Sequence, residues 1–186
     1  MSRPPRSFEP DGIYHVMSRG SNREQLFRSA GDRVAFLERL ERVVERYDLR
    51  WIAYNLLGNH YHGIVQTPDA RLSHAMRDLH GGYSRLCRSV YGRDAHLFRN
   101  RFRAEHIDSR KYLLVAMRYC DLNAVRAGLC ASPEQWQWSS YRALIGLDPS
   151  PSFLSAEIFL PMLDDDLDRA RAEYADYVEQ KPVGPS

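Results

Sequence analysis

The sequence predicts an α+β fold in which an antiparallel sheet carries helices on one face and further helices follow. Three observations predict it. Residues 13–18 (IYHVMS) alternate in the way that suits a strand. Residues 51–57 and 61–66 read as two strands joined tightly at Gly58 and Asn59, which predicts a hairpin. Two longer segments, one before and one after this hairpin, repeat apolar residues at helical spacing.

The first helix is expected to begin at Asp32, a residue type that caps helix N-termini, and to end near Tyr47. Its apolar residues recur at spacings of three and four, so one face of the helix should be buried. These residues are Phe36, Leu40, Val43, Val44 and Tyr47.

The second helix is expected over about residues 72–91, where apolar residues keep a helical period from Leu72 to Val90. Three arginines share another face of this helix, and that face passes through Gly81. A glycine inside a helix costs about 0.5–1 kcal/mol relative to alanine, so something should offset that cost. Two explanations fit: close packing against a neighbouring element, or close approach of a nucleic-acid backbone. The arginines are Arg77, Arg85 and Arg88.

A strand near residues 97–107 and a helix over about residues 109–124 complete the body of the protein. The order of elements is therefore βαββαβ plus a terminal helix. This order is typical of the ferredoxin-like arrangement, an antiparallel sheet covered by helices.

The chain ends in an acidic extension. We expect residues 1–147 to form one domain, and residues 148–186 to form a linker and a helical extension packed on the same domain. The segment DPSPS at 148–152 is the best linker candidate. An apolar stripe at helical spacing indicates that the extension docks through one face. Its members are Leu163, Leu167, Ala170, Tyr174 and Tyr177.

The length of 186 residues, with 44% hydrophobic residues, suits one globular domain with a sizeable core. The longest apolar runs are far shorter than the ~20 residues that cross a bilayer, and the first twelve residues hold no apolar signal-peptide segment. The three cysteines lack the C-x-x-C spacing of zinc or redox sites. We therefore expect a cytoplasmic protein with no membrane partner.

The formal net charge of +2 hides an uneven distribution. Residues 151–186 carry three basic and eight acidic side chains, a net −5, so residues 1–150 carry +7. Of the 26 basic residues, 24 are arginine, whose planar fork matches phosphate. A genome rich in G and C would produce the same arginine bias, so the bias alone does not identify a nucleic-acid partner.

The sharpest local motif is the pair His60 and His62. On a strand these side chains project to one side while Tyr61 projects to the other. Two imidazoles placed in this way can share one metal ion. Two ordinary surface or hydrogen-bonded histidines would produce the same pattern, so the motif alone leaves both interpretations open.

A second pair is Tyr119 and Asn123, four residues apart in the last predicted helix of the body. Residues at this spacing lie on one helix face, so a phenol and an amide oxygen would be presented together. Taken from the helical period alone, Tyr119 is better explained as a core residue.

Several motifs together are more specific than each alone. The run N-H-Y-H-G-I-V begins at Asn59, an R-x-R-F segment begins at Arg99, and R-Y-C-D-L-N-A-V-R-A-G-L begins at Arg118. With P-E-Q-W-Q-W-S-S-Y from Pro133, they resemble the IS200-like single-tyrosine transposases, which are HUH nucleases. The resemblance is greatest to the branch associated with repetitive extragenic palindromes (REP), and it covers about residues 13–177.

The resemblance implies a role for each matched residue. His60, His62 and Asn123 would be ligands of a divalent metal, Mg²⁺ or Mn²⁺, and Tyr119 would be the nucleophile. The implied activity is metal-dependent nicking and rejoining of single-stranded DNA at hairpins, through a 5′-phosphotyrosine intermediate. Ala124 stands where the family usually has proline, and Gly63 stands where a bulkier residue is common. A homodimer, in which the tyrosine serves its own site or the partner's, is also compatible with the family.

The substrate implied is single-stranded DNA with hairpin or palindromic structure, which would bring the protein to the nucleoid. Arginines of the basic body could follow its phosphates. The candidates are Arg19, Arg23, Arg77, Arg85, Arg88, Arg99, Arg101 and Arg103.

Two other functions fit parts of the pattern. A domesticated relative could bind DNA hairpins without catalysis. Alternatively, His60 and His62 could hold a metal that activates water for hydrolysis, although sites of that kind usually need bridging carboxylates, which are scarce around these histidines.

Overall fold

The computed structural model describes residues 7–92 and 96–180. Its four strands form one antiparallel sheet in the order β2-β3-β1-β4. Helix α1 (Ala30–Tyr47) connects β1 to β2, and helix α2 (Leu72–Tyr91) connects β3 to β4. This order confirms the predicted α+β, ferredoxin-like fold. The strands are β1 (Gly12–Arg19), β2 (Arg50–Leu56), β3 (His60–Thr67) and β4 (Arg103–Ile107).

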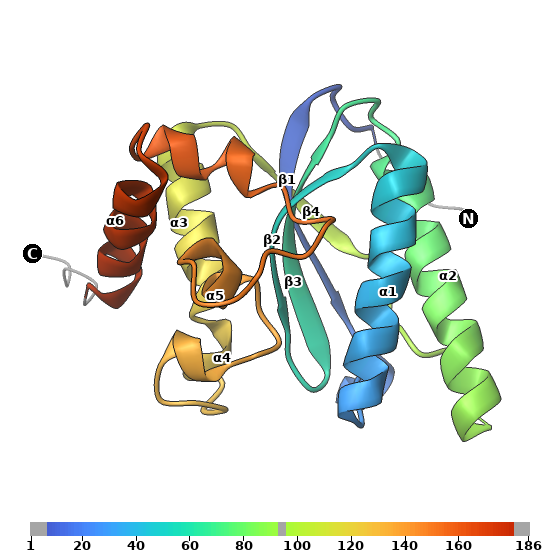
Figure 1. The fold of residues 1–186 in the computed structure, drawn as a ribbon. Coiled ribbons are helices and arrows are strands. Elements are labelled where there is room, and N and C mark those ends of the chain that lie inside the picture. Colours follow the sequence, from blue (N-terminus) through green and yellow to red (C-terminus); the bar gives the residue numbers. More distant parts are fainter. Residues whose placement is uncertain (1–6, 93–95, 181–186) are drawn as a thin grey trace, which may run out of the picture.

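Helices lie on both sides of the sheet (Figure 1). Helices α1 and α2 pack side by side on one face, as the sequence predicts. The later helices gather on the opposite side, where α3 contacts β2 and β3. They are α3 (Arg110–Asp121), α4 (Asn123–Arg126), α5 (Tyr141–Leu144) and α6 (Leu167–Glu179). Short 3-10 helices are η1 (Ser21–Arg23), η2 (Pro133–Gln135), η3 (Ala156–Ile158) and η4 (Leu160–Met162).

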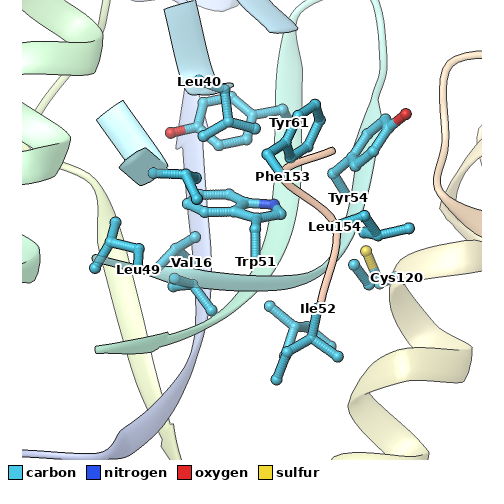
Figure 2. Packing of buried hydrophobic residues seen from close by; sticks show 14 of the residues in the cluster. Val16, Leu40, Leu49, Trp51, Ile52, Tyr54, Tyr61, Cys120, Phe153 and Leu154 are labelled. Carbon is cyan, nitrogen blue, oxygen red and sulfur yellow. The ribbon is translucent and has the colours of Figure 1, made fainter. Parts of the chain in front are cut away.

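The main core lies between the sheet and the pair α1–α2. Figure 2 shows Trp51, Leu40 and Tyr61 packed together in it, and all three are fully buried. The indole of Trp51 covers Gly63, where a Cβ atom would come within 2.4 Å of the ring. A larger residue at position 63 would therefore displace the tryptophan, which explains why this chain has glycine there.

The boundaries of two helices differ from the sequence prediction. Helix α1 begins earlier because Ser29, and not Asp32, is its N-cap. The Ser29 hydroxyl accepts a hydrogen bond from the Asp32 amide, and the Asp32 carboxylate accepts one from the Ser29 amide. This reciprocal capping box satisfies two amides that a helix start leaves unpaired. The predicted helix over 109–124 is interrupted at Leu122, which divides it into α3 and α4.

The strand predicted over 97–107 is shorter in the structure. β4 begins at Arg103, and Phe98 makes only an isolated bridge to Gly20. β4 is an edge strand that pairs with β1 alone. The arginine-rich residues 99–102 therefore lie outside the sheet, next to its edge.

The C-terminal segment contacts the body in two places. Phe153 and Leu154 are buried, and Leu154 bridges to Trp51 at the edge of β2. Helix α6 packs on α3 and η4. Its buried residues are Ala170, Tyr174 and Val178, whereas Leu167 is 50% exposed. The predicted stripe is therefore right at its centre and wrong at Leu167, which lies at the first turn of the helix.

Candidate active site

The paired histidines lie at the start of β3, where the hairpin loop ends. Residues of β3 alternate between the two faces, so Tyr61 packs on Phe36 of α1 while His62 contacts the α3 side. The rings of His60 and His62 are 5.2 Å apart between centroids. Asn59 contacts His60, with 2.7 Å between its Oδ1 and the imidazole Nδ1. The pair predicted from H-x-H is therefore on one face and closely spaced.

A third histidine, His15 of β1, joins this pair. Its Nε2 lies 2.9 Å from Nδ1 of His62, and the two rings stack with centroids 5.1 Å apart. The sequence analysis missed His15. The signal for it was present, because Ile13, His15 and Met17 alternate with the buried residues of β1 and therefore face the same side as His62.

Tyr119 of α3 faces these two histidines. Its ring makes edge contacts with His62 and His15, at centroid distances of 5.6 and 5.8 Å. Tyr119 is 39% exposed, so part of the residue is accessible from solvent. A cavity of about 570 Å³ opens beside it, lined also by Arg103 and Glu105 of the edge strand. Of the predicted residues, the structure therefore brings Tyr119, His62 and Arg103 into one cavity.

Tyr112 lines the same cavity one helical heptad before Tyr119. A hydrogen bond from the Tyr112 hydroxyl to the Glu105 carboxylate raises the pKa of Tyr112 to about 12. A phenol held in this way is harder to deprotonate, which makes it a weaker nucleophile. Tyr112 is thus a well-matched reference for Tyr119, on the same helix and in the same cavity.

Asn123 follows at the helix break. Its side-chain Nδ2 donates to the carbonyl of Tyr119 at 2.6 Å, so its Oδ1 keeps its acceptor sites. Asn123 is 8% exposed and does not line the 570 Å³ cavity. Its link to the other predicted residues runs through the Tyr119 backbone. The spacing prediction, that the two residues share one face of one helix, is therefore modified by the break at Leu122.

A buried asparagine that the sequence analysis missed supports this break. Asn55 of β2 donates its Nδ2 to the carbonyls of Cys120 and Asp121, at 2.8 and 3.3 Å. It pairs directly with His62 across the sheet. Asn55 therefore ties the end of α3 to the strand neighbour of the histidine. A polar residue within an otherwise apolar strand was the sequence signal for it.

The far side of α3 is fastened to α6. The Tyr174 hydroxyl donates to the carboxylate of Asp121 at 2.5 Å, and both residues are fully buried. Arg118 donates through Nε to the carbonyls of Tyr177 and Val178, at 3.0 and 3.2 Å. A cation at the last turn of a helix is favourable because the helix C-terminus carries partial negative charge. These contacts hold the helix that carries Tyr119 from behind.

Burial keeps the active-site histidines neutral. Burial, helped by the charges of neighbouring groups, lowers the pKa of His62 to about 2. Burial, with the nearby cation of Arg19, lowers the pKa of His60 to about 4. Burial also lowers the pKa of His15. Neutral imidazole is the form that coordinates metals, so all three rings are in that form at neutral pH.

The donor set suits a weakly held divalent cation. Among residues 7–92 and 96–180, no cluster of three or more His, Cys, Asp or Glu side chains could hold a metal ion. The expected set contains only two imidazoles and the amide oxygen of Asn123, which is nitrogen and oxygen chemistry without a carboxylate. His15 occupies Nδ1 of His62 and leaves Nε2 of that ring for a ligand. The residues fit a metal in chemistry, with little protein charge to bind it.

The eight candidate arginines separate into three groups. Arg19, Arg99, Arg101 and Arg103 surround a cavity of about 360 Å³ that adjoins the Tyr119 cavity. Arg23 lies near the hairpin loop, where its carbonyl accepts a hydrogen bond from Asn59. The last group lies on α2, on the far side of the sheet. Its members are Arg77, Arg85 and Arg88.

Comparison with protein families identifies the family of the chain. Residues 10–123 match the family described as "Transposase IS200 like". The chain belongs to the IS200-like transposase family. The family predicted from the sequence motifs is thereby confirmed, and it gives the protein a role as a transposase, an enzyme that acts on DNA.

One solved structure agrees with this assignment at the level of the fold, and two others share less of it. A REP-associated tyrosine transposase bound to a REP hairpin is 21% identical, with a TM-score of 0.68, over 80% of this chain and 89% of that one. A putative transposase from Deinococcus radiodurans R1 is 13% identical over 61% of this chain and 92% of that one, with a TM-score of 0.45. A tRNA(His) guanylyltransferase from Saccharomyces cerevisiae is 10% identical over 98% and 85%, with a TM-score of 0.49. No curated protein sequence matches the chain.

Within the described residues of this transposase, none of the helices is both long and apolar enough to span a membrane.

Proposed function

We propose that this transposase nicks and rejoins single-stranded DNA beside hairpins, with Tyr119 as the nucleophile. The observation that carries the proposal is the contact of the Tyr119 ring with His62 in a solvent-open cavity of about 570 Å³. Tyr119 meets His62 of the same chain, so the proposed site acts within one chain. A homodimer is not needed to complete it.

The chemistry proposed is in-line attack on a phosphodiester. The Tyr119 oxygen forms a bond to phosphorus, and the bond from phosphorus to the 3′-oxygen breaks. The phenolic proton passes to solvent, which the 39% exposed side chain contacts, and the departing 3′-oxygen takes up a proton. The product is a 5′-phosphotyrosine and a free 3′-hydroxyl. Attack by a second DNA 3′-hydroxyl reverses the step and rejoins the DNA, so no external energy source is needed.

The metal ligands in this proposal are His60, His62 and the Asn123 oxygen. Membership of the family supports a divalent metal at this site. A bound Mg²⁺ or Mn²⁺ would supply Lewis-acid polarisation of the scissile phosphate. The protein's own part is to hold both imidazoles neutral and to orient them. His15 orients the ring of His62, and Asn55 holds the end of α3 against the same strand pair.

The DNA contacts proposed begin at the arginines beside the Tyr119 cavity. Arg19, Arg99, Arg101 and Arg103 surround the adjoining cavity, where they would neutralise DNA phosphates and release the cations condensed on the DNA, so binding should weaken as salt rises. The REP-associated relative is bound to a REP hairpin, which supports a hairpin substrate for this chain.

Covalent capture tests the proposal. Hairpin-bearing single strands are incubated with Mg²⁺ or Mn²⁺, and a protein–DNA adduct that survives denaturant is sought on a gel. Wild type and Tyr112→Phe should form the adduct, and Tyr119→Phe should not. The hydroxyl of Tyr112 is the matched control because it lines the same cavity.

Two other outcomes would select the competing functions. Tight DNA binding by wild type without any adduct would indicate a non-catalytic hairpin binder. Cleavage without an adduct, retained in Tyr119→Phe, would indicate a metal-dependent hydrolase. One carboxylate, Glu105, lines the cavity, and it is already engaged by Tyr112, which favours the tyrosine mechanism over water activation.

A further inference from the structure

A second large cavity lies on α2, away from Tyr119. Its volume is about 630 Å³, within the range of small-molecule sites. Residues of α2 form one wall, and the segment just before β4 forms the other. Its principal lining residues are Ser73, Met76, Arg77, Gly81, Arg101 and Phe102.

The two adjacent glycines in the middle of α2, Gly81 and Gly82, have different explanations. A Cβ atom at Gly82 would lie 2.0 Å from the Arg39 guanidinium, so Gly82 serves the packing of α1 against α2. A Cβ atom at Gly81 would meet only the flexible end of Arg85, at 3.6 Å. Packing therefore does not require glycine at position 81. Gly81 instead leaves room in the cavity, at the cost that glycine imposes on a helix.

The second cavity continues the one at the active site. The Tyr119 cavity shares Met17 and Arg103 with the arginine-lined cavity of about 360 Å³. That cavity in turn shares Arg101 with the cavity on α2. The three hollows thus follow one another from Tyr119, past the start of β4, to the other side of the sheet.

The lining of the α2 cavity suits a nucleotide. Arg77 and Arg101 supply cationic forks for phosphate, and Ser73 adds a hydroxyl. Met76 and Phe102 are 0% and 6% exposed and form only the floor of the cavity, so the ring against which a base can lie is the exposed imidazole of His74, which also lines it. Within the described residues, no carboxylate lines this cavity, so an anionic ligand meets no repulsion there.

We propose that the α2 cavity binds one nucleotide of the same DNA strand whose scissile phosphate lies at Tyr119. This inference rests on the proposed function, because it places that substrate strand along the three cavities. The arginines at the start of β4 would bind the DNA phosphates between Tyr119 and the α2 cavity. The cavity would add affinity only for strands long enough to span both sites.

The test is the dependence of binding on strand length. Fluorescence anisotropy measures the Kd of oligothymidylates of 4 to 20 nucleotides with EDTA present, so no cleavage is required. Wild type should show a step in affinity of about fivefold or more at one length, the value expected for one stacked base. Gly81→Met, which fills the cavity, should bind short strands as wild type does and lose the step.

Two variants control for bulk and charge. Val90→Met adds a methionine to the exposed part of the same helix and should keep the step. Arg77→Ala should reduce the step, whereas Arg42→Ala, on the exposed surface of α1, should not. If Gly81→Met fails to fold by circular dichroism, Arg77→Ala still decides the question. A step that survives both Gly81→Met and Arg77→Ala, or no step in wild type, overturns the proposal.

A free nucleotide is the alternative occupant. If thymidine monophosphate binds in a Gly81-dependent way and wild type shows no length step, the cavity binds free nucleotides and the strand proposal is wrong. The result is independent of covalent capture. An adduct at Tyr119 without a length step would contradict only the proposal of nucleotide binding in the α2 cavity. A length step without an adduct would contradict only the proposal that Tyr119 cleaves DNA.

Discussion

The two faces of the sheet differ in what they bury. On the face covered by α1 and α2, Tyr61 packs among aromatic rings and is completely enclosed. On the other face, α3 covers the sheet only in part and leaves His15, His62 and Tyr119 around an open cavity. Tyr61 and His62, which are adjacent in β3, therefore have different roles. Apolar burial on one face supports the fold, so that the other face can hold polar groups in defined positions.

The largest expected effect comes from the closed face. Tyr61→Ala removes a fully buried ring, and should lower the free energy of unfolding by about 3–5 kcal/mol. Urea denaturation followed by circular dichroism measures the change. A loss below about 1 kcal/mol would contradict the assignment of stability to this face.

His62, which follows Tyr61 but lies on the open face, should matter for catalysis. His62→Ala removes a proposed metal ligand and should slow adduct formation by about 100-fold or more. Binding of single-stranded DNA in EDTA should change little, because His62 is 2% exposed and offers almost no surface to DNA. Adduct formation at wild-type rate by the folded variant would show that His62 is not part of the catalytic site.

A smaller effect is expected where α3 is fastened from behind. Tyr174→Phe removes the hydroxyl that donates to the buried carboxylate of Asp121, and should cost about 1–3 kcal/mol of unfolding free energy. Tyr177→Phe is the control on the same helix, since Tyr177 is only partly buried, and should change stability by less than about 0.5 kcal/mol. Equal effects of the two variants in urea denaturation would show that the Asp121 contact contributes nothing.

The last prediction concerns acid stability, through a histidine on the closed face. Burial lowers the pKa of His80 to about 3, and its Nε2 lies 2.6 Å from the Tyr61 hydroxyl. Between that value and the ordinary pKa of about 6.5, the unfolded chain binds a proton that the folded chain does not. Unfolding free energy should therefore fall by about 1.4 kcal/mol per pH unit on this account as the pH drops below 6.5, and stay unaffected above it.

His80→Gln isolates this contribution. His60 and His62 act in the same direction, so wild type should lose stability more steeply than one histidine explains. The variant's slope of unfolding free energy against pH should be lower by one proton. Equal slopes for wild type and variant between pH 6.5 and 4 would show that His80 does not resist protonation.

Much of the fold could be predicted because its signals are local. Helix α2 has the predicted bounds because its apolar period runs unbroken from Leu72, and the hairpin follows from two strands around Gly58 and Asn59. The start of α1 was missed because Ser29 and Asp32 are both good caps, and their reciprocal hydrogen bonds decide between them. The carbonyls just before Leu122 accept hydrogen bonds from Asn55, a residue far away in the sequence, so local spacing could not indicate the break.

Some residues of the candidate site could also be predicted from local patterns, and others could not. The strand alternation placed His60 and His62 on one face, and family motifs named Tyr119 and Asn123. His15 could not be assigned from its own neighbourhood, since its contact with His62 joins residues 47 apart in the chain. The grouping of Arg19 with Arg99, Arg101 and Arg103 likewise needs the pairing of β1 with β4.

The sequence by itself determined the order and kind of the main helices and strands, the face on which most of their residues lie, and the family to which the chain belongs. These depend on the periods of helix and strand and on short motifs, which are properties of neighbouring residues. Only the tertiary structure decided which faces meet: His15 with His62, Asn55 with the end of α3, and Tyr174 with Asp121. The physical reason is that such contacts form between segments brought together by burial of the core, and their partners are not encoded in local spacing.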